Sequence, residues 1–156
     1  MKKVFVVIIF CCTFISCREN AHDNSNEKNM KNDFISRLHT PELETDYYKI
    51  LGTTSLEKHI SDFQKINWKE DFWNEHNSGN FNMTDLEVFN VTDSRYLSIT
   101  TSPNTDDSFQ FAVGLGTHKE TEDINNPIRK TKLYFVGTEN TDIPKRLIEL
   151  FFKREY

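Results

Sequence analysis

Cysteine is scarce in this chain, and its placement excludes several kinds of chemistry. All three cysteines lie among the first 17 residues, at Cys11, Cys12 and Cys17. The residues that follow therefore form no disulfide among themselves and supply neither a thiol nucleophile nor a cysteine-rich metal site. This excludes cysteine hydrolases, thioredoxin-like redox proteins and zinc ribbons as functions of that part.

Long hydrophobic runs are also missing, apart from one short run near the start. Residues 4–15 are almost entirely apolar, follow Lys2 and Lys3, and are followed by Ser16. A helix of about 12 residues spans about 18 Å, which is well short of the roughly 30 Å hydrocarbon core of a bilayer. Basic residues, an apolar run and a small residue, in that order, are typical of a secretion signal. We expect residues 1–16 to be a signal peptide.

The end of this run, Phe14-Ile15-Ser16-Cys17, resembles the cleavage box of bacterial lipoproteins, although Phe14 stands where that family prefers leucine. The resemblance implies that the Cys17 sulfur receives a diacylglycerol and that a signal peptidase cuts between Ser16 and Cys17. Two or three acyl chains hold a protein stably at a membrane. We expect a lipid-anchored protein of the bacterial cell envelope, at the outer membrane and either periplasmic or surface-facing. The alternative is an ordinary secretory signal with an incidental cysteine.

Basic residues are outnumbered by acidic ones. The chain has 19 Lys and Arg against 24 Asp and Glu, and removal of residues 1–16 would leave 17 against 24. Proteins that bind nucleic acid depend on lysine and arginine to displace counterions. We therefore expect no nucleic-acid partner.

Apolar residues are nearly absent from residues 18–33, so this segment cannot repay the entropy cost of becoming ordered. Residues 17–33 are expected to be a lipidated cysteine followed by a flexible tether. Residues 34–156 have the length of one domain with one core, and they contain no internal repeat.

Two segments of this domain have apolar residues at helical spacing. The first begins at a capping-box pattern, Thr54 with Glu57 three residues later. The second begins at Thr141 or Asp142, with Pro144 near its first helical position. A further short helix is expected at residues 34–38. The expected buried sides are Leu56, Ile60, Phe63 and Ile66 in the first helix, and Ile143, Leu147, Ile148, Leu150 and Phe151 in the second.

Between these helices the apolar pattern changes to a period of two. Residues 86–91 and 96–100 alternate around a polar four-residue link and predict a hairpin. Residues 108–115 and 132–136 predict two more strands, and residues 47–51 a short one or an extended lead-in. The fold class is therefore α+β: a four- to five-stranded antiparallel β-meander with two main helices packed on one face.

The histidines offer no recognisable metal site. No two of them lie four residues apart, the spacing at which two imidazoles share a metal on one helix face. Residues 104–108 lack the alternating acids and central glycine of a calcium loop and are expected to form a turn. We expect no metal, no cofactor and no catalytic residue, with a cluster assembled in space left open. The histidines are His22, His39, His59, His76 and His118.

Residues 66–76 are the most unusual segment of the domain, because they combine Trp68, Phe72 and Trp73 with acidic residues. In a helix Trp68 and Phe72 would share one face. One interpretation places all three aromatic side chains in the core. The other exposes Trp73 among the acids as a protein-binding surface, and makes these three the candidate partner-binding residues.

Three functions remain open. The first is a lipid-anchored, non-enzymatic protein-binding module, for example an immunity protein against a secreted toxin. The second is a carrier with an apolar pocket lined by residues such as Phe109, Phe111 and Tyr134, which requires a cavity of roughly 300 Å³ or more. The third is a small hydrolase with His118 or His76 beside a carboxylate in an open cleft. We rank them in that order.

Overall fold

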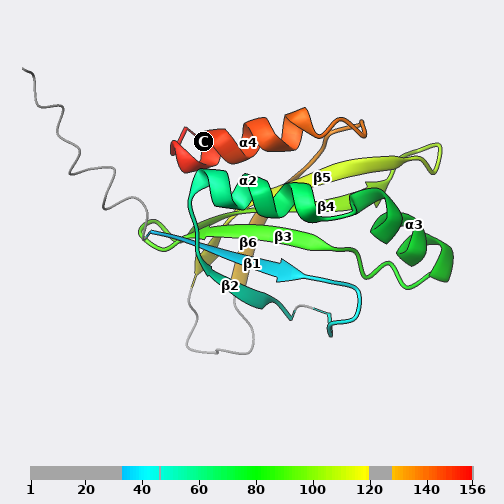
Figure 1. Cartoon of the computed structure of the whole chain (residues 1–156), viewed down its shortest axis with the longest axis horizontal. Coiled ribbons are helices and arrows are strands. Elements are labelled where there is room, and N and C mark those ends of the chain that lie inside the picture. The colour runs from blue at the N-terminus through cyan, green and yellow to red at the C-terminus, as the bar shows by residue number, and fades with distance from the viewer. Residues whose placement is uncertain (1–32, 46, 120–127, 156) are drawn as a thin grey trace, which may run out of the picture.

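The computed structural model describes residues 33–45, 47–119 and 128–155, and these residues form an α+β fold (Figure 1). Within the described ranges there are six strands and three helices. In chain order they are β1 (Phe34–His39), β2 (Lys49–Thr53), α2 (Leu56–Lys65), α3 (Trp68–Ser78), β3 (Asp85–Asn90), β4 (Arg95–Pro103), β5 (Phe109–Lys119), β6 (Ile128–Phe135) and α4 (Asp142–Phe152).

The strands form one open sheet in the order β2-β1-β3-β4-β5-β6, and every neighbouring pair is antiparallel. Strands β3 to β6 are the predicted meander, and the predicted hairpin joins β3 to β4 with Leu86 opposite Ile99. The sheet is larger than the four or five strands expected, because both β1 and β2 extend it beyond β3. The predicted short strand near residues 47–51 is β2, shifted by two residues.

The expected short helix at residues 34–38 is wrong, because these residues form β1. Side chains alternate along it: Ser36 bonds to His59 of α2, whereas Arg37 pairs with Glu87 on the opposite face. A segment of six residues is too short to be stable as an isolated helix. As a strand it is bonded on both sides, to β2 and to β3, so its backbone polar groups find partners.

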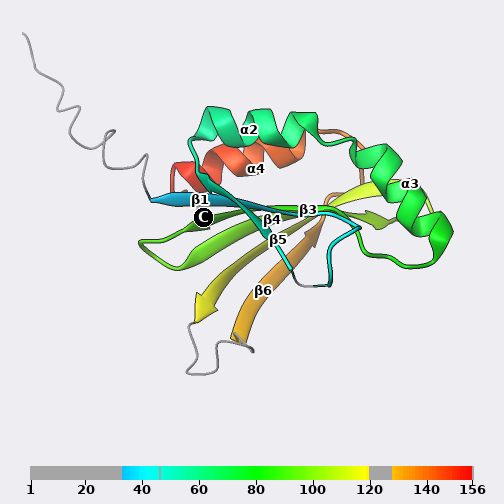
Figure 2. The same cartoon turned by 60° about the horizontal axis from the view of Figure 1, so that its bottom comes forward.

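Helices α2 and α4 lie side by side over one face of the sheet, and α3 lies at one end (Figure 1). The opposite face carries no described helix (Figure 2). Helix α2 begins one residue later than the capping-box pattern indicates: Ser55 is the N-cap, and its Oγ accepts a hydrogen bond from the Lys58 amide at 3.3 Å. The third residue of α2 is therefore Lys58, and Glu57 is the second residue rather than the third, where a capping box places the acid.

The core lies between the sheet and the helices and is rich in aromatic rings. Phe63 of α2 and Trp68 of α3 contact Phe111 of β5, with ring centroids 5.8 Å and 5.6 Å apart. Aromatic pairs at such distances add to the free energy gained by burial. No described helix has both the length and the apolar character needed to cross a membrane.

Helix α4 covers the sheet incompletely. Ile148 and Phe151 are buried as predicted, but Ile143 is 41% exposed and Leu147 and Leu150 are only half-buried. The prediction of five buried apolar residues is thus wrong for Ile143. The helix packs over β4, while β6 lies beyond it at the edge of the sheet, so one apolar side of α4 is left partly uncovered.

Candidate functional site

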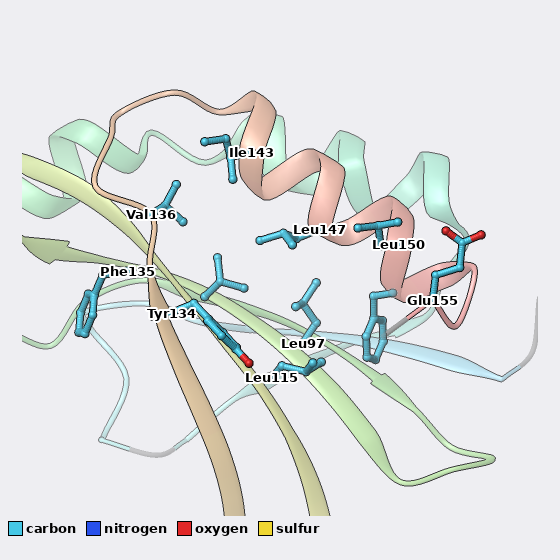
Figure 3. A pocket seen from close by; sticks show the side chains of 11 residues that line it. Leu97, Leu115, Tyr134, Phe135, Val136, Ile143, Leu147, Leu150 and Glu155 are labelled. Carbon is cyan, nitrogen blue, oxygen red and sulfur yellow. The ribbon is translucent and has the colours of Figure 1, made fainter.

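The uncovered side of α4 forms one wall of an apolar groove (Figure 3). Ile143, Leu147 and Leu150 point from α4 toward the sheet, and Leu97 and Leu115 lie opposite them on β4 and β5. The cavity between these walls has a volume of about 400 Å³. This lies in the range of sites that hold small ligands or anchoring side chains of a partner.

Strand β6 closes the groove only in part. Tyr134 is paired with Val113 and points into the groove, while Phe135 and Val136 border its end (Figure 3). Among the described residues that line the groove, Glu155, which follows α4, is the only charged one. The groove is therefore apolar along its length, with an acid at one end.

The apolar surface continues around the edge of the sheet. Three consecutive residues of β6 are exposed: Leu133 by 52%, Tyr134 by 51% and Phe135 by 59%. Because side chains alternate along a strand, Leu133 and Phe135 project to the face opposite Tyr134. We call Leu133, Tyr134, Phe135, Ile143 and the groove beside them the β6 surface.

The second edge of the sheet is built differently. Strand β2 has only five residues, its pairing with β1 shifts between Ser36 and Arg37, and Gly52 has a φ of 92°. Short length and an irregular register are features that protect an edge from pairing with another strand. Strand β6 has eight residues in continuous register with β5, and no described strand pairs with its outer side.

The sequence-predicted candidates Trp68, Phe72 and Trp73 lie in the packing of α3. Trp68 and Phe72 are buried, and the Trp68 Nε1 donates a hydrogen bond to the Phe63 carbonyl oxygen at 2.9 Å. Trp73 is half-buried and packs edge-on against Phe72 at 4.9 Å between centroids. The three side chains therefore occupy the core and its margin in this structure, and they are far from forming one exposed aromatic patch.

The pocket residues named from the sequence are only partly correct. Phe109 and Phe111 are buried in the core and do not line the groove, whereas Tyr134 does. Sequence periodicity identified the correct face of β5. It could not show which end of that face α4 would leave open.

The helix-free face of the sheet carries a buried polar network that sequence reasoning missed. Glu87 is fully buried, and its Oε1 lies 2.5 Å from Arg37 Nη2 and 2.6 Å from Arg37 Nε. The Asp85 Oδ2 accepts hydrogen bonds from Ser98 Oγ at 2.7 Å and from Tyr48 OH at 3.1 Å. Burial raises the pKa of Asp85, and these two hydrogen bonds oppose the rise. The signal available in the sequence was the spacing of Asp85 and Glu87, which lie two residues apart and therefore on the same face of a strand.

The side chains of this polar network link three strands of the sheet. Arg37 belongs to β1, Glu87 and Asp85 to β3, and Ser98 to β4. The Arg37 guanidinium also lies 4.7 Å from the centroid of the Tyr48 ring, a cation–π arrangement. The described residues contain no group of three or more histidine, cysteine, aspartate or glutamate side chains placed to hold a metal ion.

One histidine and one serine form a buried pair. The His59 Nδ1 lies 3.0 Å from Ser36 Oγ, and both side chains are fully buried. Burial lowers the pKa of His59 to about 4. Since neither side chain reaches solvent, the pair joins α2 to β1 and does not present a nucleophile to a substrate.

The other histidines are not brought together. His39 contacts the Asn82 Oδ1 through Nε2 at 2.9 Å, and His76 stacks on the Phe72 ring at 5.3 Å between centroids. His22 lies outside the described residues, and the side chain of His118 lies outside the described side chains. The His76 Nδ1 is buried and has no hydrogen-bond partner among the described residues, so this nitrogen is not paired with a carboxylate as the hydrolase hypothesis requires.

Residues 104–108 form the predicted turn, which joins β4 to β5. Its Asp106 Oδ1 accepts hydrogen bonds from the Ser108 amide at 3.0 Å and from its Oγ at 2.5 Å. These bonds hold the pKa of the Asp106 carboxyl below its usual value. The loop is closed by its own side chains, as expected for a hairpin connection.

The expected signal peptide, Cys17 and the expected tether up to residue 32 lie outside the described residues. Asp33, the last residue of the expected tether, is described, and its carbonyl oxygen accepts a hydrogen bond from the Val91 amide at 2.8 Å. Comparisons of the chain with protein-family models, with curated proteins and with solved structures found no match.

Proposed function

We propose that this chain is a lipid-anchored protein of the bacterial cell envelope whose folded domain binds a partner protein through the β6 surface. The anchor is supported by the signal-like residues 1–16 and by Cys17. The binding role is supported by the structure around β6. The proposal includes no reaction and no cofactor.

The observation that carries the binding role is the shape of the exposed apolar area. Leu133 and Tyr134 belong to opposite faces of β6 and are both about half exposed, so the area wraps around the sheet edge. Contiguous apolar surface of this kind is typical of protein-binding sites. A small molecule in the groove would cover Tyr134 and leave Leu133 in water, whereas a protein could cover both.

The experiment compares two charge insertions at exposed apolar positions. Ile143→Asp places a carboxylate in the first turn of α4, where the helix dipole tolerates it, so the fold should be retained. Ile50→Asp is the matched control, because Ile50 is 71% exposed on the opposite edge strand β2. We expect Ile143→Asp to reduce capture of a specific partner from solubilised envelopes by at least about tenfold, through a buried unpaired charge.

The control should retain wild-type capture. If both variants capture the same partner as well as wild type does, the β6 surface is not the binding site. If no specific partner is recovered under several growth conditions, the binding role itself is contradicted.

A second candidate function is supported by the cavity volume. About 400 Å³ of apolar space is enough for a small hydrophobic ligand. A carrier should retain such a molecule through gentle purification, and native mass spectrometry of the intact chain would detect it as an added mass. A protein without added mass that also fails to bind apolar dyes would exclude this candidate.

A further inference from the structure

We infer that the partner presents an extended segment that adds a seventh strand to the sheet at β6, with three consecutive apolar residues followed by an acidic residue. This rests on the partner-binding function proposed above. It is carried by the outer edge of β6, where no described strand pairs, by the three exposed apolar residues and by Lys132 next to them.

The backbone of β6 can pair on its outer side. The Val136 amide donates to the Phe111 carbonyl oxygen at 3.0 Å, so the amide at position 136 points toward β5. In an antiparallel ladder the direction of these groups alternates with each residue. The amides and carbonyls of Leu133 and Phe135 therefore point away from β5, toward the edge where no described strand lies.

The apolar part of the partner follows from the register. A residue opposite Tyr134 in an added strand would lie on the helix side of the sheet and enter the groove beside Leu147. Residues opposite Leu133 and Phe135 would lie on the other face and cover side chains that are 52% and 59% exposed. An added strand thus covers all three positions at once, which a helix placed on either face would not do.

The acidic part follows from the charges along β6. Its sequence is Ile-Arg-Lys-Thr-Lys-Leu-Tyr-Phe, so Arg129, Lys130 and Lys132 precede the apolar residues. Directly opposite pairs of unlike charge stabilise a sheet, and pairs of like charge destabilise it. An acidic residue opposite Lys132 is favoured by this rule. Strand β6 of a second copy would supply no such partner, because β6 contains no acidic residue.

The test starts with a displayed library of random linear peptides selected on the intact chain. The selected peptides should contain three adjacent apolar residues next to an acidic residue. Two variants then separate strand pairing from side-chain contact. Leu133→Ala removes the apolar side chain and keeps the outward amide, while Leu133→Pro removes both. Proline is tolerated on an edge strand where its missing donor faces solvent.

We expect the dissociation constant of the selected peptides to rise at least about tenfold more in Leu133→Pro than in Leu133→Ala, since the proline variant loses a backbone hydrogen bond and the close approach of the strand. Circular dichroism establishes that each variant is folded. If Leu133→Pro does not fold, Lys132→Glu decides: binding should weaken about threefold and recover for peptides in which lysine replaces the acidic residue.

An empty selection, selected peptides without the expected pattern, equal binding by the two Leu133 variants, or a Lys132→Glu variant that binds both peptide types alike would each overturn strand addition. Failure of the proposed function looks different. If partner capture survives Leu133→Pro and is lost in Ile143→Asp, the groove binds the partner without strand pairing. If capture survives both variants, the β6 surface has no binding role.

Discussion

The buried pair of His59 and Ser36 makes the stability of this protein dependent on pH in a way that can be calculated. His59 is fully buried, and its Nε2 has no hydrogen-bond partner in the described structure. Burial lowers its pKa from 6.5 to about 4, with the positive charge of Lys58 adding to the effect and Asp62 opposing it. The folded protein therefore favours the neutral ring more strongly than the unfolded chain does.

The direction of the effect follows from the lowered pKa. The neutral His59 ring contributes fully to the free energy of unfolding above pH 6.5. This contribution is lost as the pH falls toward 4, because the unfolded chain takes up a proton that the folded ring resists. Each pKa unit corresponds to about 1.4 kcal/mol, so the full effect is about 3 kcal/mol. Of this, about 2 kcal/mol is lost between pH 7 and pH 5.

The assay is urea unfolding at pH 7 and pH 5 of the wild type and of His59→Gln. Glutamine does not titrate in this range and can still bond to Ser36. Asp85, whose pKa is raised, contributes in the opposite direction as the pH falls, but it does so in both proteins. The wild type should lose about 2 kcal/mol more unfolding free energy than the variant does. Equal losses in the two proteins would refute the reasoning.

Three further predictions concern the core, a helix cap and the anchor. Phe72→Ala should lower the unfolding free energy by about 3 to 5 kcal/mol in the same assay, because Phe72 is fully buried against several rings; a loss below about 1 kcal/mol would mean that α3 is not packed as described. Ser55→Ala should cost about 1 kcal/mol, since its Oγ caps α2, while Thr54→Ala should not lose this cap. Cys17→Ser should abolish labelling by radioactive palmitate and release the protein from the membrane fraction; a labelled or membrane-bound variant would contradict lipidation at that sulfur.

The sequence was informative wherever structure is set by neighbouring residues. The alternation at residues 86–91 and 96–100 and the polar link between them predict the β3–β4 hairpin, because its pairing is local. The helix that the sequence predicts at residues 34–38 is wrong because the strand character of β1 depends on β2 and β3, which lie on either side of it in the sheet. A segment of six residues carries too little periodicity to decide between the two.

The β6 surface could not be predicted for a related reason. Its groove combines Leu97, Leu115, Tyr134 and Leu147, which come from four separate elements. Each of these residues alone fits an ordinary core position. Only the placement of α4 over β4, rather than over β6, leaves Leu115, Tyr134 and Leu147 partly uncovered, and that placement is a property of the whole fold.

The central claim is that the β6 surface binds a partner protein in the envelope, and site-specific photo-crosslinking in cells tests it most directly. A photoreactive phenylalanine analogue is placed at Phe135 on the β6 surface or at Ile50 on β2, both of which are more than half exposed. We predict one discrete, heavier adduct from position 135 and none from position 50. An adduct from position 50 alone, the same adduct from both positions, or no adduct from position 135 would contradict the claim.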